Sequence, residues 1–321
     1  MVQHAVRRPL GESVAQKKPV LFERQRRLLA LLNALGRVHR LDFQKLLFLY
    51  GHERDVEAPY EFVPHAAGAF SFTCAADQEK LLARGLIVNE DDCWRLTDAG
   101  KQAARCPSSV VAKLSAFALR TRQLRGESLV AETYRRFPYY ATRSEVAERV
   151  LRGDADALRR IAEIRTRMAA ATAQLLTIGY EGRTLESYLN TLLRAGVTTL
   201  CDVRRNPISR KYGFSKRVLA SAADQVGIRY EHLPELGIAS ADRKSLVTQA
   251  DYDALFADYE RSHLPRQTEA LNEIRTWLNA GDRVALTCYE RQPEQCHRRS
   301  VAQALTAVRA TGSVGLATKH L

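Results

Sequence analysis

The sequence lacks the patterns that would assign it to several specialised classes of protein. No uncharged apolar run approaches the roughly 18–20 residues of a membrane-spanning helix, and no apolar stretch follows the basic N-terminus to form a signal peptide. Six cysteines in 321 residues are too few for a disulfide scaffold, so we expect reduced thiols. No C-x-x-C or H-x-x-x-H pair occurs, which disfavours a zinc site and points to no particular cofactor. These absences predict a cytoplasmic protein that makes no contact with membranes.

What the sequence does have is an ordinary globular composition with an excess of basic residues. Hydrophobic residues make up 45% and charged residues 26%, which excludes wholesale disorder, and the length favours two or three domains. The net charge is +13, of which +9 lies within residues 1–170. Such an excess is expected in a protein that approaches polyanions, because each neutralised phosphate releases counterions, but many basic proteins bind no nucleic acid. Charge alone therefore leaves the question open.

The N-terminal part has the order of elements of a winged helix. Residues 1–20 mix charge, glycine and proline without apolar periodicity, which predicts a flexible basic arm. Apolar residues at helical spacing predict two short helices within residues 23–50, and Ser71 is a suitable N-cap for a third helix. Residues 86–97 predict two short strands around an acidic tip. We therefore predict a winged-helix domain over residues 21–105.

A winged helix can read DNA or dock a protein, and the charges here leave both roles open. The expected recognition helix carries few basic residues, and Asp77 and Glu79 on it would face phosphates unfavourably. Arginines on the first two helices could contact a nucleic-acid backbone instead. The partners we predict are nucleic acid, with DNA favoured over RNA, and a second copy of the chain or a partner protein bound through the N-terminal domain.

The rest of the chain predicts a helical connector and an α/β domain. Residues 106–172 have the spacing of helices throughout. In residues 173–321, short apolar runs alternate with helical segments, which is typical of βαβ units. The predicted fold class is therefore α/β, a mostly parallel sheet with helices on both faces, preceded by an all-helical connector and a winged-helix (α+β) N-terminal domain.

Chemically unusual residues collect directly after the predicted strands of this α/β domain. Parallel strands bring their carboxyl ends to one edge of a sheet, where ligands bind, so four polar loops predict one site. The candidate catalytic residues are Glu181, Asp202, Cys288, Glu290, Cys296 and His297. The candidate substrate- or phosphate-binding residues are Tyr180, Arg204, Arg205, Asn206, Arg210, Tyr212, Lys216 and Arg298.

Each of these candidates also has a purely structural interpretation. Asp202 follows a buried strand, so it is either the partner of an arginine or an acid that faces a ligand, and we favour the second. The loop RRNPISRKYGFSK suits phosphate binding and base stacking, although a solvated loop would look similar. Cys288 and Cys296, with His297 beside the second, suit a nucleophile, a redox thiol or a metal ligand, or are only small apolar side chains.

Four motifs occur in order in this part of the chain: TIGYEG at residues 177–182, DVRRNP at 202–207, LPELG at 233–237, and a C-x-E followed by P-x-x-CHR at 288–298. By these motifs, residues 176–308 resemble the domain-of-unknown-function family 488. Residues 26–140, through KLLFLY and YEFVPHAAGAFSF, more distantly resemble the winged-helix modules of the SocA antitoxin-like group. The resemblance implies where the site lies and implies no reaction, because the family's activity is unassigned.

The function we predict is an enzyme directed at nucleic acid or a nucleotide, a hydrolase of nuclease or glycosidase type to which the winged helix delivers substrate. The alternative is a ligand-sensing DNA-binding regulator or antitoxin-like protein without catalysis. A third interpretation is a thiol redox or sulfur-handling enzyme that uses Cys288 and Cys296. The sequence leaves the substrate, the cofactor, the metal requirement and the oligomeric state open.

Overall fold

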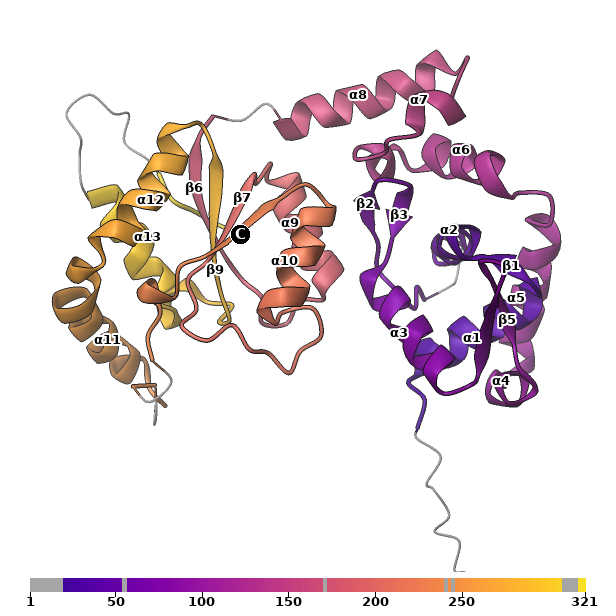
Figure 1. Ribbon diagram of the computed structural model, residues 1–321, viewed down its shortest axis with the longest axis horizontal. Coiled ribbons are helices and arrows are strands. Elements are labelled where there is room, and N and C mark those ends of the chain that lie inside the picture. Colours follow the sequence, from indigo (N-terminus) through magenta and orange to yellow (C-terminus); the bar gives the residue numbers. More distant parts are fainter. Residues whose placement is uncertain (1–19, 54–56, 170–171, 240–241, 244–245, 308–316) are drawn as a thin grey trace, which may run out of the picture.

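The computed structural model describes residues 20–53, 57–169, 172–239, 242–243, 246–307 and 317–321 of the chain. An N-terminal part and a C-terminal part lie side by side, and helix α8 (Ala155–Ala169) runs from the first toward the second (Figure 1). Within the described residues, no helix has the length and apolar character needed to cross a membrane.

The N-terminal part combines helices with a small sheet. Its elements are α1 (Glu23–Leu35), β1 (Val38–His39), α2 (Arg40–Tyr50), β2 (Val63–His65), β3 (Gly68–Phe70), α3 (Phe72–Ala83), β4 (Ile87–Glu90), β5 (Cys93–Leu96) and α4 (Asp98–Ala103). The three predicted helices and the β4–β5 hairpin are confirmed, and the Ser71 hydroxyl caps α3 by accepting from Cys74 N at 3.1 Å. The sheet has the antiparallel order β1-β5-β4, and β2 and β3 form a separate hairpin between α2 and α3.

One expectation about α3 is wrong. Asp77 does not face outward toward a phosphate backbone, because its side chain is 1% exposed and lies against α1. Its carboxylate accepts from Arg24 Nε at 2.6 Å and from Gln25 Nε2 at 2.9 Å. The hydroxyl of Tyr60 donates to it as well, at 3.1 Å. Asp77 therefore links α3 to α1 and does not contribute to the charge of the protein surface.

The middle of the chain is helical, as predicted. It contains α5 (Ser108–Arg120), α6 (Gly126–Arg136), the 3-10 turn η1 (Pro138–Ala141), α7 (Ala147–Val150) and α8. Leu114 and Phe117 of α5 and Leu129 of α6 are buried in the same apolar cluster as α1 and α2. The core of the N-terminal part therefore extends through α6, while Tyr134 and Ile161 belong to a smaller cluster around α7 and α8.

The C-terminal part is a parallel sheet with helices on both faces, which confirms the predicted α/β architecture. Its elements are β6 (Gln174–Gly179), α9 (Leu185–Arg194), β7 (Thr199–Asp202), α10 (Lys216–Gln225), β8 (Arg229–His232), η2 (Pro234–Leu236), α11 (Gln249–Asp258), the π-helical turn η3 (Tyr259–His263), η4 (Leu264–Arg266), α12 (Thr268–Asn279), β9 (Arg283–Cys288), η5 (Pro293–Gln295), α13 (Arg298–Ala307) and β10 (Lys319–His320). The strands pair in the order β10-β6-β9-β7-β8, and every pair is parallel.

Successive residues of the strands belong to two separate hydrophobic cores, one on each face of the sheet. Leu176 and Leu200 pack under α9 and α10, whereas their neighbours Leu175 and Cys201 pack under α12 and α13. This period of two arises because successive side chains of a strand point to opposite faces. Both faces are covered at the three inner strands, which explains why β6, β7 and β9 are largely apolar. The two helical layers are visible on either side of the sheet in Figure 1.

The N-terminal part packs directly on the α9 layer. Glu186, in the first turn of α9, is 1% exposed and accepts from Ser71 Oγ at 3.1 Å and from Thr73 N at 2.7 Å. Burial raises the pKa of this carboxyl, and its hydrogen bonds oppose the rise. Val63 and Phe72 belong to the same apolar cluster as α9, so the two parts of the chain share a core.

Candidate functional site

The carboxyl ends of three neighbouring strands place the predicted loops beside one another. Strand β9 lies between β6 and β7, so Gly179, Cys288 and Asp202 end adjacent strands. Gly179 is needed at this point, because a Cβ there would lie 1.9 Å from the carbonyl oxygen of Glu290. The glycine therefore allows the loops after β6 and β9 to touch.

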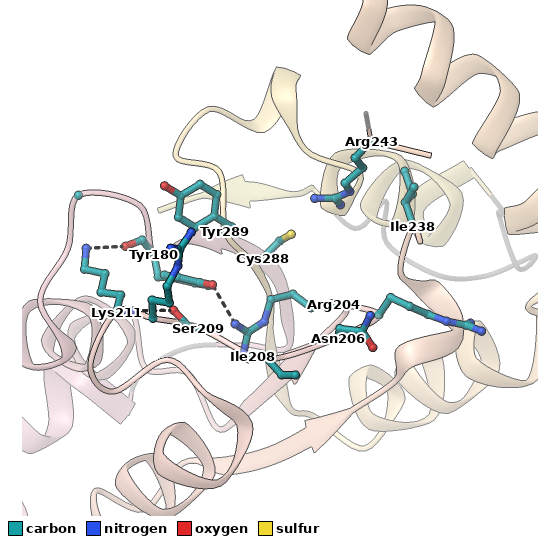
Figure 2. A pocket seen from close by; sticks show the side chains of 13 residues that line it. Tyr180, Arg204, Asn206, Ile208, Ser209, Lys211, Ile238, Arg243, Cys288 and Tyr289 are labelled. Atoms are coloured by element: carbon teal, nitrogen blue, oxygen red, sulfur yellow. Dashed lines mark hydrogen bonds between the residues drawn. The ribbon is translucent and has the colours of Figure 1, made fainter. Parts of the chain in front are cut away.

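A cleft of about 460 Å³ opens at this edge of the sheet (Figure 2). It is lined by Tyr180, Gly182, Arg204, Arg205, Asn206, Ile208, Ser209, Arg210, Lys211, Ile238, Arg243, Cys288 and Tyr289. Five of these side chains are cationic and none is acidic. Arg205 and Arg210 are exposed, and neither has an acidic partner among the residues that the structure describes. The cleft therefore presents uncompensated positive charge to a ligand.

Asp202 and Arg204 form a buried ion pair at the base of the cleft. The carboxylate of Asp202 is 0% exposed and accepts from Arg204 Nε at 2.8 Å and Nη2 at 2.6 Å, and from the Tyr230 hydroxyl at 2.6 Å. Burial alone would lower the pKa of Arg204, but the hydrogen bonds and charge of Asp202 raise it. Of our two interpretations of Asp202, the structure shows the arginine partner and not the acid that faces a ligand. We therefore expect Asp202 to hold the loop in place and not to react.

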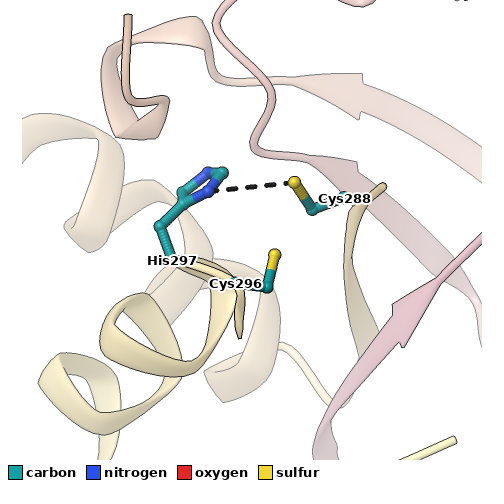
Figure 3. Close-up of side chains that lie close together, drawn as sticks. All are labelled: Cys288, Cys296 and His297. Atoms are coloured by element: carbon teal, nitrogen blue, oxygen red, sulfur yellow. Dashed lines mark hydrogen bonds between the residues drawn. The ribbon is translucent and has the colours of Figure 1, made fainter. Parts of the chain in front are cut away.

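Two cysteines and a histidine meet behind the cleft (Figure 3). Cys288, at the end of β9, lines the cleft, whereas Cys296 and His297, just before α13, are fully buried. Cys288 Sγ lies 3.8 Å from Nδ1 of His297, and Nε2 of the same ring donates to the carbonyl oxygen of Val203 at 2.8 Å. The bond to a carbonyl fixes Nε2 as the protonated nitrogen, so Nδ1 presents its lone pair toward the sulfurs.

Glu290 and Arg243 complete this group of side chains. The Cys288 thiol donates to Glu290 Oε2 at 3.3 Å. Arg243 donates to Glu290 Oε1 at 3.0 Å and to His297 Nδ1 at 2.6 Å. Burial, followed by the charge of Cys288, raises the pKa of Glu290. The cluster therefore contains one acid, one arginine, one imidazole and two thiols in direct contact.

The two thiols have opposite shifts of pKa. A hydrogen bond from Cys296 lowers the pKa of Cys288 well below that of an ordinary thiol. Burial opposes this effect, and the contact with the His297 ring and the charge of Arg243 add to it. Burial and the neighbouring Cys288 raise the pKa of Cys296 well above the ordinary value. The directions of the two shifts therefore make Cys288, which lines the cleft, the thiol of the pair that loses its proton more easily.

The C-terminal part of the chain matches one known protein family. Residues 184–305 match the family described as "Domain of unknown function DUF488". We call the C-terminal part, which contains this match, the DUF488 domain. The match confirms the resemblance seen in the sequence motifs. No curated protein and no solved structure gives a significant match to the chain.

Several other predicted residues of the DUF488 domain lie at the edge of the site and have structural partners. Glu181 accepts from the backbone N of Arg291 at 2.9 Å. Arg298 is 1% exposed and donates to the carbonyl oxygens of Glu290 and Arg291 at 2.6 and 3.0 Å, so it holds the loop after β9. The Lys216 ammonium lies 3.0 Å from His232 Nδ1, outside the cleft lining.

Tyr212 also points away from the cleft. Its hydroxyl donates to the carbonyl oxygen of Phe72 at 3.0 Å, so the loop that lines the cleft is joined to the N-terminal part. By contrast, Tyr180, Asn206 and Arg210 do line the cleft, together with Arg204 and Arg205.

Sequence reasoning missed Arg243, Ile238 and Tyr289. Arg243 lies in the loop between η2 and α11, where no strand end or motif marks it. Tyr289 stands between two predicted residues and is 46% exposed at the cleft. Its position directly after Cys288 is a signal that the strand-end argument could have used.

One group of side chains in the DUF488 domain could hold a metal ion. The ligand atoms of Cys288, Cys296 and His297 all lie within 4.8 Å of one another. Two thiolates and one imidazole are a donor set that suits zinc. This contrasts with our expectation of no metal, which relied on the absence of closely spaced pairs in the sequence.

Proposed function

We propose that the chain is a hydrolase acting on a phosphate-bearing substrate, a nucleotide or a nucleotide unit of a nucleic acid, bound in the cleft of the DUF488 domain. The observation that carries the proposal is the lining of the cleft, which has five cationic side chains, no acidic one, and a cysteine at its floor. Arginine is suited to phosphate because its planar fork donates two parallel hydrogen bonds.

The cationic side chains of the cleft that have no acidic partner among the described residues lie on one loop. Arg204 is neutralised by Asp202 and Arg243 is paired with Glu290, so Arg205, Arg210 and Lys211 are the cations left for a ligand. All three belong to the segment after β7. They support phosphate binding at the loop side of the cleft, with the scissile bond turned toward Cys288.

The size and the aromatic wall of the cleft support a nucleotide. A volume of about 460 Å³ lies in the range of small-molecule sites and is too small for a duplex. The exposed ring of Tyr289 offers a face on which a base can stack. In the reaction, the oxygen of water bonds to phosphorus or to an anomeric carbon as the ester or glycosidic bond breaks, and the leaving group takes a proton.

As part of this proposal, we assign the N-terminal part to the winged-helix class. The order α1-β1-α2-β2-β3-α3-β4-β5, with β1 paired to β5, supports that assignment, and the β2–β3 hairpin is an insertion between α2 and α3. The first turn of α3, which reads bases in DNA-binding members of this class, is here bonded to Glu186 of α9. This contact favours a role for α3 in joining the two parts over a role in reading DNA.

The test is a survey of substrates with the wild-type chain and matched arginine variants. Labelled single- and double-stranded DNA and RNA, and free nucleotides, are incubated with the protein with and without divalent metal. We expect product from the wild type. The double variant Arg205→Ala/Arg210→Ala should lose about 10- to 100-fold in kcat/KM per arginine, because each charged hydrogen bond contributes about 1.5–3 kcal/mol.

The matched control is Arg217→Ala, since Arg217 is exposed on α10 and is not part of the cleft lining. It should retain wild-type kcat/KM. Absence of product from every substrate, or equal activity of the double variant and the control, would refute the proposal.

A further inference from the structure

We propose that Cys288, Cys296 and His297 bind one Zn²⁺ ion at the floor of the cleft. Their three ligand atoms lie within 4.8 Å of one another, and all three side chains are buried (Figure 3). Zn–S bonds of about 2.3 Å and Zn–N bonds of about 2.0 Å place sulfur and nitrogen ligands of a tetrahedral ion roughly 3.5 Å apart. The observed separation of Cys288 Sγ and His297 Nδ1 is 3.8 Å, so small side-chain movements suffice.

The histidine is already oriented as a metal ligand. A zinc-bound imidazole almost always donates its other N–H to a carbonyl or carboxylate, which fixes the ring and the tautomer. His297 Nε2 donates to the carbonyl oxygen of Val203, directly after β7. Its Nδ1 accepts from Arg243 in this structure, and zinc would take over that lone pair and leave Arg243 paired with Glu290.

The charges around the three ligands balance a divalent ion. When Zn²⁺ binds, Cys288 and Cys296 each release a proton to solvent, and the two thiolates neutralise the ion. The adjacent Glu290 and Arg243 carry opposite charges in contact with each other. Zinc therefore adds no net charge to a buried region, which removes the main cost of placing a cation there.

The fourth position of the ion would face the cleft, because Cys288 is the ligand that lines it. Glu290 Oε2, 3.3 Å from Cys288 Sγ, lies where it can accept a proton from a water at that position. Three protein ligands with one open position are the pattern of catalytic zinc, which lowers the pKa of bound water to about 7. This catalytic role rests on the proposed function, whereas zinc binding itself does not.

The experiment measures metal on the full chain before any substrate is needed. Metal-free protein is prepared under reducing conditions and titrated with Zn²⁺ against a chromophoric chelator, and a parallel sample receives Co²⁺. We expect one equivalent of metal and, with cobalt, a thiolate-to-metal charge-transfer band together with the intense visible bands of a tetrahedral site.

Variants separate the site from adventitious binding. Cys288→Ser, Cys296→Ser and His297→Ala should each weaken zinc binding by more than about 100-fold. Loss of a residue that only supports a ligand already weakens metal binding by about 10- to 100-fold, and loss of the ligand itself should cost more. Cys93→Ser is the matched control, since Cys93 lies in β5 of the N-terminal part, and it should bind zinc as the wild type does. Far-UV circular dichroism verifies that each variant is folded, and Glu290→Gln, which leaves all three ligands in place, should retain one equivalent.

The outcomes distinguish this inference from the proposed function. Zinc binding no tighter than in the folded Cys288→Ser variant, or a cobalt spectrum without a thiolate band, would overturn the zinc site. Hydrolysis by protein shown to be free of metal, which stops on alkylation of Cys288, would overturn the catalytic role of the zinc and would leave the hydrolase with a thiol nucleophile. Tight, cysteine-dependent zinc binding without hydrolysis of any substrate would support the zinc site and overturn the proposed function.

Discussion

Replacing Asp202 by alanine should mainly destabilise the protein, because this carboxylate is the counter-charge of a buried arginine. In the wild type it accepts from Arg204 N, Nε and Nη2 at 3.1, 2.8 and 2.6 Å and from the Tyr230 hydroxyl at 2.6 Å. The Arg204 side chain is 7% exposed, so water cannot replace the lost partner. After the substitution, Nη1 of Arg204 keeps only the Tyr180 hydroxyl and the carbonyl of Phe214.

Breaking a buried pair in this way costs about 3–5 kcal/mol, which is a large part of the 5–15 kcal/mol that stabilises typical proteins. The corresponding fall in melting temperature is about 6–20 °C, at about 2–4 °C per kcal/mol. Urea unfolding followed by circular dichroism gives the free energy, and thermal unfolding gives the midpoint.

The double variant Asp202→Ala/Arg204→Met removes both charges and should recover at least half of the lost stability, because an apolar pair leaves no unpaired ion behind. The reasoning fails if Asp202→Ala unfolds within about 0.5 kcal/mol of the wild type, a change typical of surface positions. It also fails if the double variant is no more stable than the single one. A stable Asp202→Ala protein without activity would assign the carboxylate to the reaction instead.

Three further changes test other parts of the structure. Gly179→Ala should lower the melting temperature and weaken ligand binding at the cleft, because its Cβ would lie 1.9 Å from the Glu290 carbonyl oxygen; thermal unfolding with and without ligand checks this. Glu186→Ala leaves the donors of Thr73 unpaired and should cost about 1–3 kcal/mol in urea unfolding, whereas no loss would contradict a joined interface. Lys45→Met should stabilise the protein by about 3 kcal/mol at pH 7, since burial lowers the pKa of Lys45 from 10.5 to about 8 and folding then opposes its protonation. That gain should shrink as the pH rises from 8 to 10.5, where only the unfolded lysine still binds a proton, and a gain independent of pH would refute the argument.

The sequence predicted most elements of the DUF488 domain, because short runs that suit strands alternate with segments at helical spacing. It did not predict α11, which has no buried residue and therefore no apolar face. It did not predict β1, β2, β3 or β10, since strands of two or three residues are too short to show a period. Their pairing depends on contacts with distant parts of the chain, such as β10 with β6.

The same limit applies to the site. The strand-end rule located Cys288, Arg205 and Arg210, because parallel strands bring their carboxyl ends together whatever the loops contain. It could not find Arg243, because no residue pattern in the sequence around it indicates that it lies at the cleft. It also could not decide whether Asp202 faces a ligand, since that depends on how Arg204 folds back two residues later.

The contact between α3 and α9 limits which fragments of the protein can be expected to keep their structure. Val63 and Phe72 complete the apolar layer over α9, and Tyr212 ties the cationic loop to the backbone at Phe72. A fragment that starts at β6 would expose this layer to water and release the loop from its anchor. Truncation would therefore disturb the cationic loop of the cleft, and point substitutions in the intact chain are the better way to study the two halves separately.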